Sequence, residues 1–212
     1  MAYHNGKLGT ISKNFRLEID DFYEGGDLFQ AAFPDFNRYS LEYYELNNIM
    51  EILSMYKIEE DFVSIPIFDA LIANNDRHCD NWGVLNGVDG IRLAPIYDNG
   101  SSLGFNETSI NKEKMLSDNR MLQGFCNRGR PSIGIYGKKK PKHIELLAFL
   151  RKNFPETTLM NFRRLEKLNV GILTNIVNNI PNKAIDDLNK KWVVHLILYR
   201  RDWLLNWFEG NV

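Results

Sequence analysis

The chain has 212 residues, of which 44% are hydrophobic and 25% are charged, and its formal net charge is −1. This length can bury a sizeable core, and a single domain is the default expectation. A near-neutral charge gives no sign of a dedicated nucleic-acid or anionic-membrane binder, so we expect no direct nucleic-acid binding. Cys79 and Cys126 are the only cysteines. Two thiols form no disulfide framework, which favours a reducing compartment.

The N-terminal region predicts little regular structure. It has no apolar stretch of the kind found in signal peptides. The longest apolar runs, such as 193–199, are too short to span a bilayer, so we expect a cytoplasmic protein without a membrane segment. Lys7–Phe15 could form one extended segment, and Gly25-Gly26 indicates a turn.

Helical periodicity begins near residue 40. Ser40 occupies an N-cap position before apolar residues at helical spacing, which predicts a helix through about Met55. Phe62–Ile72 fits a second helix, with a start or a kink near Pro66 because proline has no N–H to donate. Further helices are predicted at 144–152, 158–168 and 172–180, and from about 184 onward. One stripe of the last helix is predicted to pack in the core: Ile185, Leu188, Trp192, Leu196, Tyr199, Trp203 and Trp207.

Between the second and third predicted helices, the spacing of hydrophobic residues changes from a helical period to that of β-strands. Residues 82–85 and 91–94, separated by a glycine-containing turn at 86–90, predict a β-hairpin. Residues 105–143 show little pattern of either kind. The expected fold is therefore α+β and predominantly helical, with a small β-hairpin near the middle of the chain.

The segment from Asn74 to Asp98 carries the strongest functional signal. A helix ends in a polar loop that holds Asp76 and Asn81, and the hairpin then returns the chain beside that loop, with Asp98 following its second strand. Two carboxylates and an amide oxygen can thus converge in one cleft. Phosphoryl transfer uses such a set, because one carboxylate accepts the proton of the attacking hydroxyl while oxygen ligands hold Mg²⁺.

The spacing supports this interpretation. Asp76 and Asn81 lie five positions apart, like the catalytic Asp and the metal-binding Asn of protein kinases. The strings N-N-D-R-H-C-D-N-W-G-V-L and L-A-P-I-Y-D-N-G-S-S-L-G resemble HipA-like serine/threonine kinases, which are bacterial toxin kinases. The resemblance implies that Asp76 is the catalytic Asp and that Asn81 and Asp98 bind Mg²⁺ and, through it, ATP. His78 would act in the same loop, as a structural or a phosphate-facing residue.

The resemblance also implies an architecture. Residues 40–212 would form a kinase-like C-lobe whose hairpin carries the metal-site Asp98, and residues 1–39 would be a remnant of the hinge and lobe junction. A kinase further needs a phosphate-covering loop and a lysine paired with a helix glutamate, both in the N-lobe. Neither is recognisable here, because Gly6–Lys13 matches no phosphate-binding motif. We therefore expect a separate N-lobe to be needed for full activity.

Three functions remain open at this point. The first is an ATP/Mg²⁺-dependent serine/threonine protein kinase of the toxin type, acting on a protein substrate, with a separate N-lobe subunit or an antitoxin protein as partner. The second is a non-catalytic, kinase-derived binding module or truncated pseudokinase. The third, a metal-dependent hydrolase, is disfavoured because no second carboxylate cluster accompanies Asp98.

Several residues near this segment allow two interpretations. Asp80 fits a solvated charge, and Cys79 is either an inert thiol or an oxidisable one. A basic stretch could dock an acidic substrate or form a solvated loop of like charges. Its members are Arg128, Arg130, Lys138, Lys139, Lys140, Lys142 and His143.

Overall fold

The computed structural model describes residues 2–9 and 11–210. The strands are β1 Ala2–His4, β2 Lys7–Gly9, β3 Asp21–Glu24, β4 Gly83–Gly87 and β5 Gly90–Leu93. The helices of the first half are α1 Gly25–Ala32, α2 Leu46–Ser54, α3 Glu59–Phe62 and α4 Ser64–Ile72. Those of the second half are α5 Ser109–Ser117, α6 Asn119–Arg128, α7 His143–Asn153, α8 Pro155–Glu166, α9 Val170–Asn178 and α10 Asp187–Gly210.

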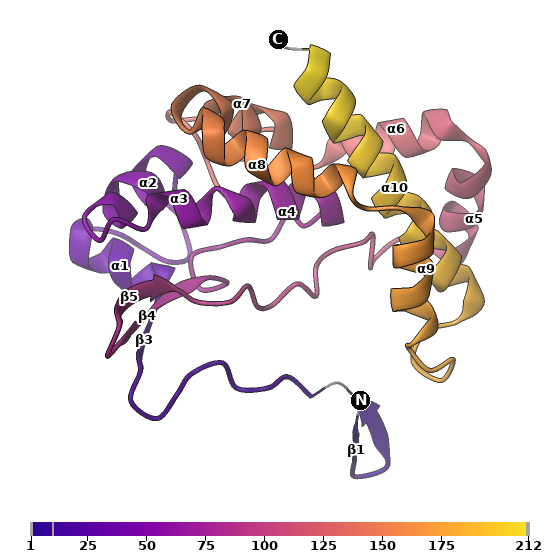
Figure 1. The fold of residues 1–212 in the computed structure, drawn as a ribbon, viewed down its shortest axis with the longest axis horizontal. Coiled ribbons are helices and arrows are strands. Elements are labelled where there is room, and N and C mark those ends of the chain that lie inside the picture. Colours follow the sequence, from indigo (N-terminus) through magenta and orange to yellow (C-terminus); the bar gives the residue numbers. More distant parts are fainter. Residues whose placement is uncertain (1, 10, 211–212) are drawn as a thin grey trace.

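The predicted hairpin is confirmed as the β4–β5 pair, in which Val84 lies opposite Leu93. A third strand that the sequence did not indicate, β3, pairs antiparallel with β4 and gives the sheet order β3-β4-β5. Residues 21–24 are thereby joined to the hairpin that leads toward Asp98. A second, two-stranded sheet of β1 and β2 lies at the N-terminal end of the chain, apart from this sheet (Figure 1).

Most helices gather over one side of the three-stranded sheet (Figure 1). Helix α4 is central among them, because it packs against α3, α7, α8 and α10. The main hydrophobic core includes Phe29, Leu53, Phe62 and Trp82, all fully or almost fully buried. This packing fixes the C-terminal end of α4, where the polar loop begins. The expected α+β, predominantly helical class is confirmed.

Several sequence predictions need correction. The helix expected from Ser40 begins only at Leu46, because Leu41 and Tyr43 adopt left-handed backbone conformations with φ of 51° and 64°. Gly25 and Gly26 open helix α1 rather than forming a turn. Of the proposed extended segment, residues 7–9 form the short strand β2, and the described residues 11–15 form no strand. The poorly patterned region 105–143 contains two helices, α5 and α6.

The later helices agree with prediction to within a few residues. Helices α7, α8 and α9 correspond to the three predicted segments, and α10 is the long final helix. Of its predicted stripe, Trp192 and Leu196 are fully buried, and Arg200 is buried with them. Within residues 2–9 and 11–210, no helix combines the length and the apolar character needed to cross a membrane.

Candidate active site

The polar loop that follows α4 presents Asp76 to solvent. Helix α4 ends at Ile72, and the left-handed backbone of its C-cap residue Ala73 (φ 57°) turns the chain away from the helix axis. The next residue, Asn74, is fully buried and donates from Nδ2 to Asp69 Oδ1 at 2.9 Å. Its Oδ1 accepts the backbone N–H of Asp76 at 3.1 Å. The buried amide therefore fixes the backbone at Asp76 while the carboxylate of Asp76 stays exposed.

A buried arginine holds this loop to the segment that carries Asp98. Arg77 is fully buried and forms a two-pronged ion pair with Asp69, at 2.7 and 3.0 Å. The same guanidinium donates to the backbone oxygens of Asn81 and Tyr97, at 2.8 and 2.7 Å, and to Asn99 Oδ1 at 2.6 Å. Arg77 thus contacts Asn81 itself and both neighbours of Asp98. This role was not predicted from the sequence, because a lone arginine in a polar loop resembles a surface charge.

The two predicted metal ligands have the donor chemistry that Mg²⁺ requires. Asn81 is buried and donates from Nδ2 to Asp76 O at 2.8 Å, which leaves its amide oxygen as the atom that can face a cation. Asp98 is exposed and has a left-handed backbone with φ of 49°. Aspartate tolerates this conformation better than most residues, because its short polar side chain can hydrogen-bond locally. A carboxylate and an amide oxygen fit a hard cation such as Mg²⁺.

The Asp98 segment also returns to the side chain of Asp76. Three residues after Asp98, Ser101 donates from Oγ to Asp76 Oδ2 at 3.0 Å. Both residues line a cavity of about 360 Å³, whose wall also includes the cationic side chains of Arg130 and Lys140. The structure therefore brings Asp76 together with the loop that carries Asp98, and it opens a cavity beside them.

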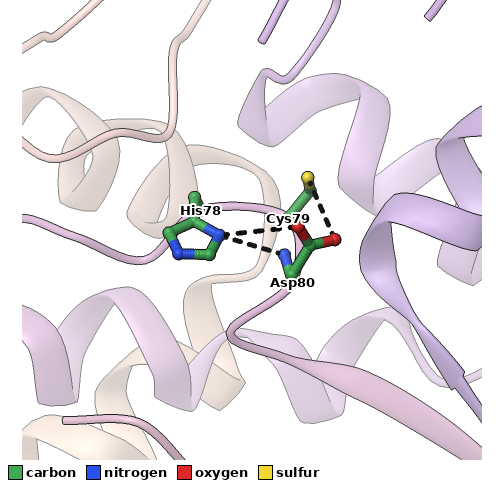
Figure 2. Close-up of side chains that lie close together, drawn as sticks. All are labelled: His78, Cys79 and Asp80. Carbon is green, nitrogen blue, oxygen red and sulfur yellow. Dashed lines mark hydrogen bonds and ion pairs between the residues drawn. The ribbon is translucent and has the colours of Figure 1, made fainter. Parts of the chain in front are cut away.

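His78, Cys79 and Asp80 form a compact cluster in the middle of the loop (Figure 2). The backbone N–H of Asp80 donates to His78 Nδ1 at 3.3 Å, and the Cys79 thiol donates to Asp80 Oδ1 at 3.5 Å. Burial raises the pKa of Cys79 to about 12, so the thiol stays protonated. The three residues are thus linked to one another by hydrogen bonds within the loop, and the buried thiol fits the inert interpretation.

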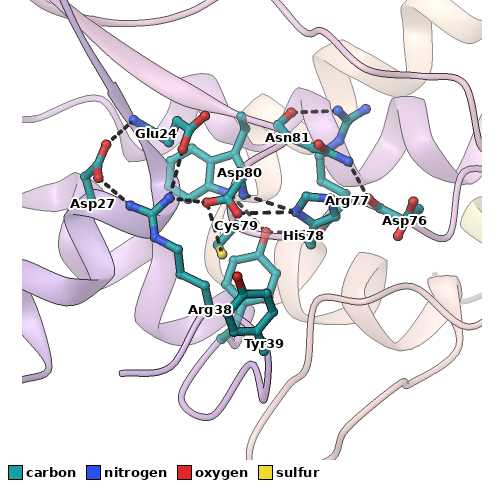
Figure 3. A network of polar contacts seen from close by, with 12 residues as sticks. Glu24, Asp27, Arg38, Tyr39, Asp76, Arg77, His78, Cys79, Asp80 and Asn81 are labelled. Atoms are coloured by element: carbon teal, nitrogen blue, oxygen red, sulfur yellow. Dashed lines mark hydrogen bonds and ion pairs between the residues drawn. The ribbon is translucent and has the colours of Figure 1, made fainter. Parts of the chain in front are cut away.

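Asp80 belongs to an ion network and is not the solvated charge that we expected. Arg38 donates to Asp80 Oδ1 at 2.6 Å, to Glu24 at 2.8 Å and to Asp27 (Figure 3). Glu24 ends β3, and Asp27 lies in the first turn of α1. The network therefore joins the polar loop after α4 to residues 24–38. Sequence reasoning missed Arg38, since its three acidic partners are scattered along the chain.

The loop is also supported from its buried side. The Trp82 indole donates to Tyr44 Oη at 2.9 Å, and the Tyr44 hydroxyl donates to Arg77 O at 3.0 Å. Burial raises the pKa of Tyr44 well above its usual value, so the hydroxyl remains a donor. Gly25 allows α1 to approach this layer, because a Cβ there would lie 2.3 Å from the Trp82 ring. The N–H of Gly25 instead donates to Trp82 O at 2.9 Å.

The basic stretch does not behave as one unit. His143 is buried, with Nε2 3.1 Å from Asn75 Oδ1, and burial lowers its pKa well below the usual value. Lys138 pairs with Glu145 at the start of α7. Arg130 and Lys140 line the cavity that contains Asp76. Arg130 and Lys140 thus lie at the candidate site, whereas His143 and Lys138 make contacts within the fold.

Comparison with solved structures shows a kinase-like α+β fold. The crystal structure of a Helicobacter pylori proinflammatory kinase, CtkA, superimposes with a TM-score of 0.73 at 18% sequence identity. The match covers 94% of this chain and 75% of that chain. The profile of the HipA-like C-terminal domain matches residues 16–192. The chain therefore belongs to the HipA-like C-terminal domain family, as the resemblance implied. A search of curated proteins gave no match.

Proposed function

We propose that this chain is the C-lobe of an ATP/Mg²⁺-dependent serine/threonine protein kinase of the HipA-like type. The observation that carries the proposal is the set of contacts made by Arg77. One buried guanidinium contacts the backbone of Asn81 and Tyr97 and the side chain of Asn99. The residues proposed to hold Mg²⁺ are thus positioned by the same side chain, although they lie 17 positions apart (98 − 81).

In this proposal Asp76 is the catalytic base. Its exposed carboxylate already accepts a hydroxyl hydrogen bond from Ser101, which is the contact that an acceptor serine or threonine would make. Asp76 would orient that hydroxyl and take its proton as the phosphoryl group is transferred. Asn81 Oδ1 and the Asp98 carboxylate would hold Mg²⁺, which supplies neutralisation of phosphate charge when it is bound.

His78 has a supporting role in the proposal. Its Nδ1 accepts the N–H of Asp80, so the neutral ring carries its proton on Nε2. From there the ring can donate a hydrogen bond to a phosphate oxygen. The exposed fraction of its side chain, 37%, leaves the ring accessible for such a contact.

The partners follow from what a kinase site requires. The phosphoacceptor is a protein, and the phosphate-covering loop and its lysine would come from a separate N-lobe subunit. We further propose a cytoplasmic toxin kinase whose activity is countered by an antitoxin protein. Under the alternative function, a non-catalytic binding module or pseudokinase, the scaffold is kept without phosphotransfer.

Two measurements test the proposal. Calorimetry with ATP, in the presence and absence of Mg²⁺, should show Mg²⁺-dependent binding that Asp98→Ala abolishes. Transfer from radiolabelled ATP, measured with neighbouring-gene products as N-lobe candidates, should be abolished by Asp76→Asn. The matched control is Asp89→Asn, which removes one exposed carboxylate in the β4–β5 turn and should change neither result.

Each contrary result is informative. Phosphotransfer that persists in Asp76→Asn would overturn the assigned base. Nucleotide binding that is equal in the wild type and in Asp98→Ala would overturn the assigned metal ligand. An absence of Mg²⁺-dependent nucleotide binding, alone and with every candidate partner, would favour the non-catalytic module.

A further inference from the structure

A second cavity, of about 160 Å³, adjoins the one that contains Asp76. The two cavities share four wall residues, namely Ala73, Asn75, Asn106 and Phe125. Farther from Asp76 the smaller cavity is lined by Arg128, His143 and Arg200. We call these two adjoining cavities the groove; one of them contains the proposed base Asp76, and the other contains the buried Arg200.

That arginine has no carboxylate partner among the residues that the structure describes. Arg200 is 1% exposed and donates from Nε to Ala70 O at 2.6 Å, while its Nη2 has no hydrogen-bond partner among the described residues. The Cys126 thiol lies beside the guanidinium, but burial raises the pKa of this thiol, so it supplies no negative charge. No ion pair with a carboxylate is formed by Arg200 in residues 2–9 and 11–210.

The other buried arginine of the site shows what is missing. Arg77 is equally buried, and its charge is matched by the two-pronged pair with Asp69. An unpaired buried charge is strongly unfavourable, and an anion that reaches it gains a large interaction energy. Arg200 differs from Arg77 in having no carboxylate partner among the described residues: its guanidinium lies 5.3 Å from the centre of the Trp203 ring, and the residue lines the smaller cavity.

The charges around the groove have the same sign as Arg200. Four cationic side chains line its two parts, namely Arg128, Arg130, Lys140 and Arg200. Two carboxylates, those of Asp76 and Glu107, oppose them. His143 adds no charge near neutral pH, because burial and the neighbouring arginines lower its pKa. The smaller cavity holds two of these cations, Arg128 and Arg200, and one of these carboxylates, Glu107, so its net charge is positive.

We propose that the smaller cavity is an oxyanion-binding site, formed by Arg200 and Arg128, for a carboxylate or phosphate group carried by the acceptor protein. The assignment to an acceptor rests on the proposed kinase function, whereas the anion site itself does not. Because the cavity that contains Asp76 adjoins this one, an acceptor whose hydroxyl meets the Asp76 carboxylate would place a neighbouring acidic or phosphorylated side chain against Arg128 and Arg200. Guanidinium groups suit both anions, since their N–H groups match two oxygens at once.

The first test needs no nucleotide. Inorganic phosphate is titrated into the full chain at constant ionic strength and followed by calorimetry. We expect saturable binding to one site and an affinity about tenfold lower in Arg128→Ala, the effect of losing one charged hydrogen bond. Arg120→Ala is the matched control, because Arg120 lies on the same helix, is 96% exposed and is not among the groove-lining residues.

Arg128→Ala keeps the test decisive even if replacement of the buried Arg200 prevents folding, because Arg128 is exposed. If circular dichroism shows that Arg200→Lys is folded, this variant should also bind phosphate more weakly than the wild type. Absence of saturable binding to the wild type would overturn the site. Equal affinities of Arg128→Ala and Arg120→Ala would do the same.

The second test addresses the acceptor. Serine peptides flanked by Glu are compared with the same peptides carrying Gln, in the presence of the N-lobe partner identified by phosphotransfer. The acidic series should have the lower KM and should compete with inorganic phosphate, and Arg128→Ala should remove the difference. Equal KM values with intact phosphotransfer would overturn the acceptor assignment alone. A different result is that phosphate binding depends on Arg128 while no peptide is phosphorylated. This result would support the anion site and would contradict both the kinase function and the acceptor role.

Discussion

The hydroxyl of Ser101 donates a hydrogen bond to Oδ2 of Asp76, at 3.0 Å. Ser101 follows Asp98 by three residues, so a side chain from the proposed metal-binding loop occupies an acceptor position of the proposed base. An incoming serine or threonine hydroxyl that approached Oδ2 from the same direction would displace this contact. Ser101 is therefore an internal competitor for Asp76.

Replacement of Ser101 by Ala should favour the acceptor. The mutation removes one neutral-to-charged hydrogen bond at a partly exposed position, a net effect of about 1 kcal/mol. We expect the KM for the acceptor to fall about fivefold with little change in kcat, measured by steady-state phosphotransfer. Ser117→Ala, at the exposed end of α5, is the control and should leave both parameters unchanged. A rise in KM for Ser101→Ala would show that Ser101 supports the base instead.

Removal of Arg77 should destabilise the whole site. The change Arg77→Ala leaves Asp69 buried without its partner and releases the contacts to Asn81 and Tyr97. Breaking a buried ion pair in this way costs about 3–5 kcal/mol of unfolding free energy. Urea denaturation of Arg77→Ala and of the exposed control Arg120→Ala measures the difference. A loss of less than about 1 kcal/mol for Arg77→Ala would contradict the central position of this ion pair.

A methyl group at Gly25 should push α1 away from Trp82 and from the polar loop that precedes it. The added Cβ would lie 2.3 Å from the Trp82 ring and 2.7 Å from Cys79 O, both on fixed parts of the core. Overpacking of this kind costs about 1–3 kcal/mol. The matched substitution is Gly124→Ala within α6, where the nearest atom would be 3.9 Å away. It should be neutral or stabilising by up to about 1 kcal/mol, because glycine weakens a helix interior. The midpoint temperature of thermal unfolding should therefore fall for Gly25→Ala and stay equal or rise for Gly124→Ala.

Buried His143 should make stability depend on pH in mildly acidic solution. Burial lowers the pKa of the folded-state ring well below 6.5, whereas the unfolded chain titrates near 6.5. Below pH 6.5 the unfolded state thus binds a proton that the folded state does not, and stability falls as pH falls. The contribution is about 1.4 kcal/mol per pH unit between the two pKa values.

His143→Gln should remove that contribution while keeping a donor for Asn75. Urea denaturation at several values between pH 5 and 7 gives the slope of stability against pH for each protein. Burial also lowers the pKa of His195, but this residue is present in both proteins and cancels in the comparison. Identical slopes would show that His143 titrates alike in the folded and unfolded states.

The local pattern of the chain was enough to predict the hairpin, the later helices and the segment from Asn74 to Asp98. These features depend on short-range chemistry: period-two alternation ended by Gly87 and Gly90, helical spacing of apolar residues, and the fixed distance from Asp76 to Asn81. The family assignment rests on the same contiguous strings, and comparison with known proteins supports it. The roles of Asp76, His78, Asn81 and Asp98 remain proposals.

What the sequence could not predict depends on contacts between distant residues. Strand β3 is recognisable only by its partner β4, about sixty positions later, and Arg38 only by the carboxylates that fold around it. The buried arginines make the same point, because Arg77 and Arg200 have identical side chains and opposite surroundings. The sequence by itself determined which chemical groups the site contains. Only the tertiary structure decided that Arg77 would be neutralised by Asp69 while Arg200 would line a cavity, because burial and pairing are properties of the packed chain.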